Sequence, residues 1–163
     1  MRKTAFAPVI DKNSKILLLG TMPGEESIRK QQYYGHKQNQ FWRIIFTLYN
    51  EPLAGDYAGR VAFLHQKGIA LWDVLQSCEG RGSLDTNIKA EIPNDFNAVF
   101  AKYPQIRHVI FTSKKAQAFY KKYVGFDIDK EFYVLPSPSP AHAAVRFEDK
   151  VVQWRLITAL LDE

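Results

Sequence analysis

Short apolar runs alternate with segments of helical periodicity along the chain, and this alternation limits the folds that the chain can adopt. Apolar residues recur at helical spacing in five segments, at 41–49, 56–67, 94–103, 114–123 and 148–161. Strands are predicted for four apolar runs, at 15–19, 69–75, 107–112 and 131–135. Strands that alternate with helices are typical of a parallel sheet with helices on both faces. The sequence therefore predicts an α/β protein.

Length and composition are those of one ordinary globular domain. The chain has 163 residues, of which 46% are hydrophobic and 24% charged, with no visible repeat or linker. We therefore expect a single domain over 1–163. The net charge of +5 favours a polyanionic partner, although a solvated surface would explain most of the basic residues. No apolar run reaches membrane-spanning length and no signal peptide is evident, so a soluble, cytoplasmic protein is expected.

Several familiar chemistries are absent from the sequence. Cys78 is the only cysteine, so no internal disulfide and no Cys-ligated zinc or iron–sulfur site can form. A cysteine nucleophile stays open, but a lone cysteine is more often a small packed residue. The chain contains no Gly-x-Ser-x-Gly elbow, no Walker phosphate loop and no dinucleotide fingerprint.

Two loops that follow predicted strands have unusual compositions. The first, 20–40, opens with Gly20-Thr-Met-Pro-Gly24, and the fourth opens with Pro136-Ser-Pro-Ser-Pro140, in which each proline fixes its own φ. Since the carboxyl ends of parallel strands share one edge, both loops can converge there with the polar loop 76–87. The segment 1–14 is predicted to be an irregular arm.

These loops carry groups that suit a nucleic acid. A rigid Ser/Pro loop can grip a phosphate without an ordering cost, whereas aromatic rings and amides can stack and read a base. Plain surface loops are the alternative. His36 and His142 could contact phosphate, act as acid–base groups or be structural. Asp73 and Asp85 could orient water, bond a base or act as caps.

The loop motifs resemble those of a known group of enzymes. Gly20-Thr-Met-Pro-Gly24 resembles the first motif of the uracil-DNA glycosylase superfamily, and Leu135-Pro-Ser-Pro-Ser139 resembles its second motif, which grips DNA phosphates. The stretch from Gln32 to Trp42, together with Arg81-Gly-Ser-Leu-Asp85, is similar to the hypoxanthine-DNA glycosylase family, also called DNA-deoxyinosine glycosylases. The resemblance covers about residues 6 to 160.

This resemblance implies a fold, a reaction and a set of site residues. The implied fold is a three-layer α/β/α arrangement around a four-stranded parallel sheet. The implied reaction is hydrolysis of a deaminated base, hypoxanthine or also uracil, from double- or single-stranded DNA in base excision repair. No metal and no cofactor are implied, and a monomer that associates with the nucleoid is expected.

Asn39 occupies the place of the family's catalytic asparagine, and its amide would position the attacking water. The implied base-binding residues are Gly20, Thr21, Met22, Pro23, Gly24, Tyr33, Tyr34, His36, Phe41, Ser83, Asp85 and Ser113. The implied phosphate-binding residues are Ser137, Ser139 and His142.

Two positions depart from the family pattern, and several rival interpretations stay open. Thr112-Ser113 stands where the family usually has Asn-Gly, so a backbone contact to the base could survive there, but an asparagine side-chain contact could not. Ser139-Pro140 stands where a bulky wedge residue is often found. The rivals are a uracil- or mismatch-specific glycosylase, a non-catalytic nucleic-acid-binding module, and a small-molecule hydrolase that uses a histidine. Asn39 itself could be a helix cap.

Overall fold

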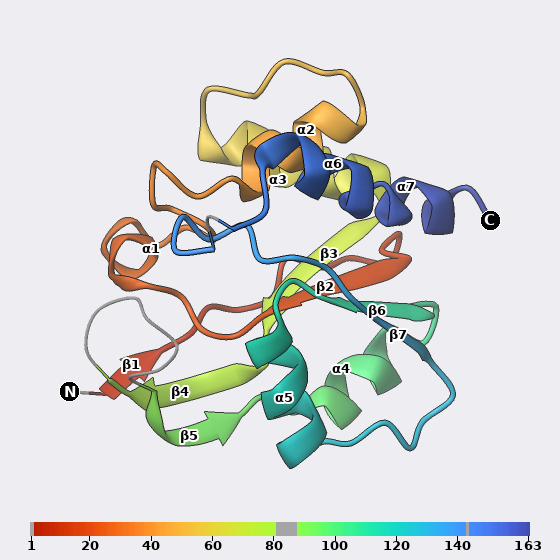
Figure 1. Ribbon diagram of the computed structural model, residues 1–163. Helices are drawn as coiled ribbons and strands as arrows, with labels where there is room; N and C mark the ends of the chain where they lie inside the picture. The colour runs from red at the N-terminus through yellow and green to blue at the C-terminus, as the bar shows by residue number, and fades with distance from the viewer. Residues whose placement is uncertain (1, 81–87, 143) are drawn as a thin grey trace.

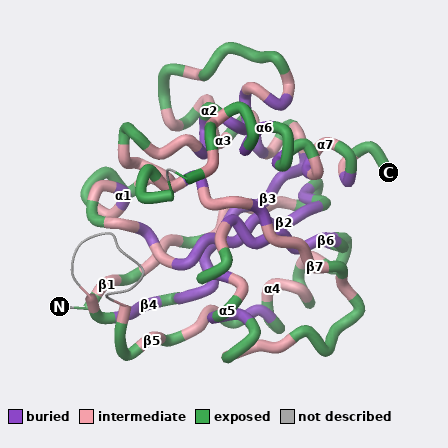
Figure 2. Tube along the Cα trace, in the orientation of Figure 1, coloured by how far each residue is buried: buried purple, intermediate pink, exposed green. Residues whose placement is uncertain are grey.

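A four-stranded parallel sheet forms the centre of the computed structural model, which describes residues 2–80, 88–142 and 144–163 (Figure 1). The strand order is β3-β2-β6-β7. The bounds are β2 (Ile16–Gly20), β3 (Ile69–Asp73), β6 (His108–Phe111) and β7 (Glu131–Val134). Every residue of β2, β3 and β6 is buried, as expected for strands covered on both faces (Figure 2). The four predicted strands are confirmed.

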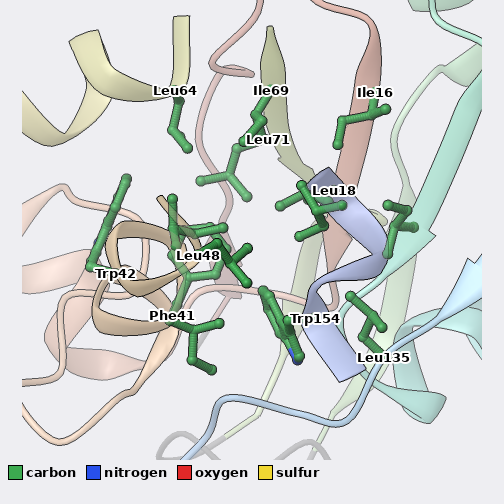
Figure 3. Packing of buried hydrophobic residues seen from close by; sticks show 14 of the residues in the cluster. Ile16, Leu18, Phe41, Trp42, Leu48, Leu64, Ile69, Leu71, Leu135 and Trp154 are labelled. Atoms are coloured by element: carbon green, nitrogen blue, oxygen red, sulfur yellow. The ribbon is translucent and has the colours of Figure 1, made fainter. Parts of the chain in front are cut away.

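Helices cover both faces of this sheet (Figure 1). One layer contains α2 (Phe41–Leu48), α3 (Tyr57–Lys67), α6 (Phe147–Trp154) and α7 (Leu156–Leu161). The opposite layer contains α4 (Phe96–Lys102) and α5 (Lys114–Tyr123). Successive residues of β2 serve opposite faces: Ile16 and Leu18 pack with the first layer (Figure 3), and Leu17 and Leu19 with the second. The predicted three-layer α/β/α fold is therefore confirmed.

A second sheet corrects two expectations. It is three-stranded and antiparallel, in the order β1-β4-β5, with β1 (Arg2–Thr4), β4 (Leu75–Glu79) and β5 (Lys89–Pro93). The segment 2–4 was expected to be irregular, and the segment from 76 was expected to be loop. Both form strands because they pair with each other. Lys3 lies opposite Cys78, although the two residues are far apart in the sequence. The predicted strand 69–75 is correspondingly divided, since β3 ends at Asp73 and β4 starts at Leu75.

Two helical boundaries also differ from expectation. The first motif loop contains a short helix, α1 (Glu25–Lys30), that has only one large apolar residue and so lacks a helical hydrophobic pattern. Acidic residues in its first turn and basic residues in its last turn suit the helix dipole instead. The predicted helix 148–161 is interrupted at Arg155, between α6 and α7. None of the helices in the described ranges is both long and apolar enough to cross a membrane.

Candidate active site

The carboxyl ends of β2, β3 and β6 bring a glycine, a carboxylate and a hydroxyl together. Gly20 pairs with Asp73 in the sheet register, and Thr112 follows β6 directly. A Cβ on Gly20 would lie 2.7 Å from Asp73 Oδ1 and 3.1 Å from Tyr34 Oη, so only glycine fits this position. Asp73 and Thr112 are both buried. The strand ends therefore form a closely packed polar cluster.

Tyr34 completes this cluster from the first motif loop. Its Oη lies 3.0 Å from Thr112 Oγ1, which itself donates to the carbonyl of Leu19 at 3.2 Å. The ring of Tyr34 is stacked on Phe41, with centroids 4.0 Å apart and an interplanar angle of 11°. Phe41 is fully buried beneath it, whereas Tyr34 is half-buried. Of the two stacked rings, only that of Tyr34 is therefore partly exposed.

Tyr33 is turned toward the N-terminal arm. Its hydroxyl donates to the carbonyl of Ala7 at 2.8 Å, and its ring meets Phe6 edge-on. Burial, followed by the negative charge of Asp73, raises the pKa of the Tyr33 phenol above its ordinary value. Trp42 Nε1 donates to the backbone carbonyl of Tyr33 at 2.9 Å. These contacts give Tyr33 a structural role in joining the loop to the arm.

Asn39 is held at the start of α2 by hydrogen bonds on both sides. Its backbone N–H donates to the carbonyl of His36 at 2.9 Å, and its Oδ1 accepts from the N–H of Phe41 at 2.9 Å. The Asn39 side chain therefore does bind the start of α2, as its interpretation as a helix cap predicts. Within the described residues its Nδ2 makes no hydrogen bond, and the side chain is half-buried. The amide is thus fixed in orientation, with one side still able to bind a ligand.

The second motif loop is stiffened by its own serines. Ser137 Oγ accepts from the N–H of Ser139 at 3.1 Å, and Ser139 Oγ accepts from the N–H of Ala141 at 3.2 Å. Each hydroxyl then keeps its own proton for another acceptor. Ser137 and Ser139 are half-buried and His142 is exposed, with its N–H bonded to the carbonyl of Ser139 at 3.0 Å.

The two motif loops touch directly. The backbone N–H of Gln40 donates to the carbonyl of Pro138 at 3.0 Å. Sequence analysis placed both loops at one edge but did not single out Gln40, whose only signal was its position beside Asn39. This hydrogen bond joins the residue after Asn39 to the second motif loop, which we call the serine loop, so the two loops do converge at one edge.

The other predicted site residues surround this junction or fall outside it. Ser113 caps α5 by accepting from the N–H of Ala116 at 3.1 Å, and its Oγ lies 3.5 Å from Thr21 Oγ1. Met22 packs on the apolar cluster of the α4–α5 layer, and Gly24 precedes α1. Thr21 and Pro23 are buried. Ser83 and Asp85 lie outside the described residues. In the described part of the chain, no cluster of three or more His, Cys, Asp or Glu could hold a metal.

Comparison with known proteins agrees with the fold. Residues 7–158 match the model of the Uracil DNA glycosylase superfamily, and the chain belongs to this superfamily. Two relatives are named Hypoxanthine DNA glycosylase. One, from Methanosarcina acetivorans, is 38% identical over 159 residues, which are 96% of this chain and 98% of the relative. The other, from Methanosarcina barkeri, is 43% identical over 117 residues, 71% of this chain and 74% of the relative.

A solved structure has the same architecture. It is the solution NMR structure of a candidate uracil DNA glycosylase from Methanosarcina acetivorans. The TM-score is 0.86 at 34% sequence identity, and the match covers the whole of both chains. The overall fold is therefore shared with that protein.

Proposed function

We propose that this protein is a DNA glycosylase that takes a deaminated base, hypoxanthine above all, out of the DNA stack and hydrolyses its N-glycosidic bond. The observation that carries the proposal is the fixed amide of Asn39, which is hydrogen-bonded to the first turn of α2 and adjoins the Pro138 loop. Membership of the superfamily and the names of two relatives support the same reaction.

The reaction would depend on positioning and electrostatics. Asn39 is not a strong base, but the second lone pair of Oδ1 can accept a hydrogen bond from a water molecule. That water attacks C1′ as the C1′–N9 bond of deoxyinosine breaks, and the base leaves with the bonding electrons. The water proton passes to solvent, and the base anion is protonated in turn. Holding water and sugar in place, and stabilising the developing charges, would supply the rate enhancement.

The base and the phosphates would occupy different parts of the site. The half-buried ring of Tyr34 offers a face for stacking, and Gly20 allows the backbone of β2 to come close to the base. Ser137 and Ser139 keep their hydroxyl protons for phosphate oxygens that flank the flipped nucleotide, and His142 lies exposed beside them.

One activity panel tests this function. The pure protein, in excess, is incubated with labelled duplexes that each contain one hypoxanthine, uracil, xanthine or mismatched thymine, and alkali then cleaves any abasic site. We expect a strand break at hypoxanthine, and single-stranded versions of the oligonucleotides will establish strand preference. Binding without product at every base would support the rival non-catalytic module.

We also propose that the protein works as a monomer on DNA in the cytoplasm, at the nucleoid. All described elements of the site, from β2, β3, α2 and the serine loop, come from one chain. Sedimentation of the protein with and without a hypoxanthine duplex measures the stoichiometry. A second protein copy in the active complex would contradict the monomer.

A further inference from the structure

One face of α6 lies behind both motif loops. Lys150 and Trp154 are one helical turn apart on this face, and both side chains are buried. Lys150 Nζ donates to Gln40 Oε1 at 2.8 Å, and Trp154 Nε1 donates to the carbonyl of Pro136 at 2.9 Å. Helix α6 packs against α2, and the Trp154 ring lies close to Phe41 (Figure 3). A single helix therefore contacts the first motif loop at Gln40 and the second motif loop at Pro136.

Gln40 receives contacts from three directions. Its side chain binds Lys150, its N–H binds the carbonyl of Pro138, and its own carbonyl accepts from the N–H of Ile44 at 2.9 Å. Asn39 precedes it directly, and the Asn39 amide is aligned by the N–H of Phe41. Any rotation at residue 40 would therefore move the Asn39 amide relative to the serine loop.

Packing alone does not account for a lysine at this place. Lys150 is 1% exposed, and within the described residues its ammonium has one hydrogen-bond acceptor, an uncharged amide. Desolvation lowers the pKa of Lys150 below its ordinary value. A buried charge without a charged partner costs stability, and an apolar side chain of similar length would fill the space at lower cost. A lysine at this buried position is therefore a candidate for a functional role.

We propose that Lys150 is a positioning residue for hydrolysis, and that it acts through Gln40 to hold the Asn39 amide at a set place beside the phosphate-binding loop. The inference rests on the proposed function, because it takes Asn39 as the group that positions water. In the sequence, the only signal for Lys150 is its place on the apolar side of a helix, one turn before Trp154 and next to Val151.

The first test is Lys150→Met, assayed on a hypoxanthine duplex under single-turnover conditions with enzyme in excess. Small displacements of a catalytic group are costly, so we expect the rate constant to fall by about 10- to 100-fold. DNA affinity should hardly change, and the midpoint of thermal unfolding should be equal or higher. Lys102→Met, at an exposed position on α4, removes the same charge and should leave both rate and affinity at wild-type values.

The second test is a double-mutant cycle, which a merely structural role would not pass. If Lys150 works through Asn39, Lys150→Met should cause no further loss of rate in an Asn39→Ala background. Equal losses in both backgrounds would show that Lys150 acts elsewhere and would overturn the inference. Gln40→Ala removes the same Lys150–Gln40 hydrogen bond from the side of Gln40, which is half-buried. This variant should show the same fall in rate even if Lys150→Met does not fold.

The outcomes separate this inference from the proposed function. An active wild type with Lys150→Met and Gln40→Ala at wild-type rates would overturn the positioning role alone. A wild type without activity on any base would overturn the proposed function and this inference together.

Discussion

Asn39 combines a local structural bond with a free amide group. Its Oδ1 binds the N–H of Phe41, so substitution affects the start of α2 as well as any bound water. Loss of the bond to Phe41 and loss of the bound water can be told apart, because the first lowers stability and the second lowers the reaction rate. Loss of a capping contact costs about 1 kcal/mol of stability, whereas loss of one preorganised polar group slows a chemical step by roughly 10² or more.

We predict that Asn39→Ala folds, still binds hypoxanthine DNA and is at least about 10²-fold slower in single-turnover assays. Asn39→Asp retains an oxygen that accepts from the N–H of Phe41 and from water, but it places a negative charge beside the leaving base, which departs as an anion. It should therefore be more stable than the alanine variant and still slow. Wild-type rates for Asn39→Ala would leave the residue as a cap only.

Gly20 is predicted to tolerate no side chain. A Cβ added at this position would lie 2.7 Å from Asp73 Oδ1, and the short side chain of Asp73 is buried and has little room to move. Gly20→Ala should lose about 1–3 kcal/mol in urea unfolding, as overpacked sites do, and should lower activity. Gly55→Ala is the matched control, because a Cβ there meets nothing within 4 Å. Equal stability of the two variants would refute the close contact.

At the scale of the element, the Pro136–Pro140 segment of the serine loop, which follows β7, is anchored at two points. It is anchored at Pro136 by Trp154 and at Pro138 by Gln40, so its backbone does not depend on contacts from the hydroxyl protons of Ser137 and Ser139. Those hydroxyls accept local N–H bonds and are half-buried. They are therefore free to donate to DNA.

The double variant Ser137→Ala, Ser139→Ala should weaken binding to every DNA sequence by a similar factor. Phosphate contacts position a protein on DNA and do not specify a base. Fluorescence anisotropy with hypoxanthine, uracil and undamaged duplexes measures the three affinities side by side. A loss confined to the hypoxanthine duplex would contradict phosphate binding and assign the serines to the base.

At the scale of the whole molecule, buried phenols connect stability to alkaline pH. Tyr120 is fully buried, and its hydroxyl has no hydrogen-bond partner among the described residues. Burial raises the pKa of Tyr120 from 10.0 to about 12. The unfolded chain thus releases this proton near pH 10, while the folded chain keeps it. Stability should therefore fall as the pH rises between 10 and 12.

Tyr120→Phe should make this alkaline loss shallower, as followed by urea unfolding at several pH values. The slope should not vanish, because burial also raises the pKa values of Tyr33 and Tyr57. At pH 7 the variant should be as stable as wild type or more stable by about 1 kcal/mol, since it removes a buried hydroxyl that lacks a partner. An unchanged alkaline slope would show that Tyr120 titrates normally.

The sequence alone determined those parts of the molecule whose signals are local. Continuous apolar runs predicted the four parallel strands, and the signal is strongest for β2, β3 and β6, which are buried throughout. Helical periodicity predicted five helical segments. The positions of the loops at Gly20 and Pro136, each after a predicted parallel strand, predicted that the two loops would lie at one edge. Gln40 and Pro138 are in fact hydrogen-bonded.

Tertiary structure alone decided the rest, because the deciding contacts join residues far apart in the chain. The strand Arg2–Thr4 exists only because Leu75–Glu79 pairs with it. Tyr33 and Tyr34 are neighbours in sequence, yet the first binds the arm at Ala7 and the second reaches Thr112, 78 positions away. Lys150 meets Gln40 across 110 positions. Hydrophobic periodicity records which face of an element is buried, but it contains no information on which distant group each polar side chain will meet.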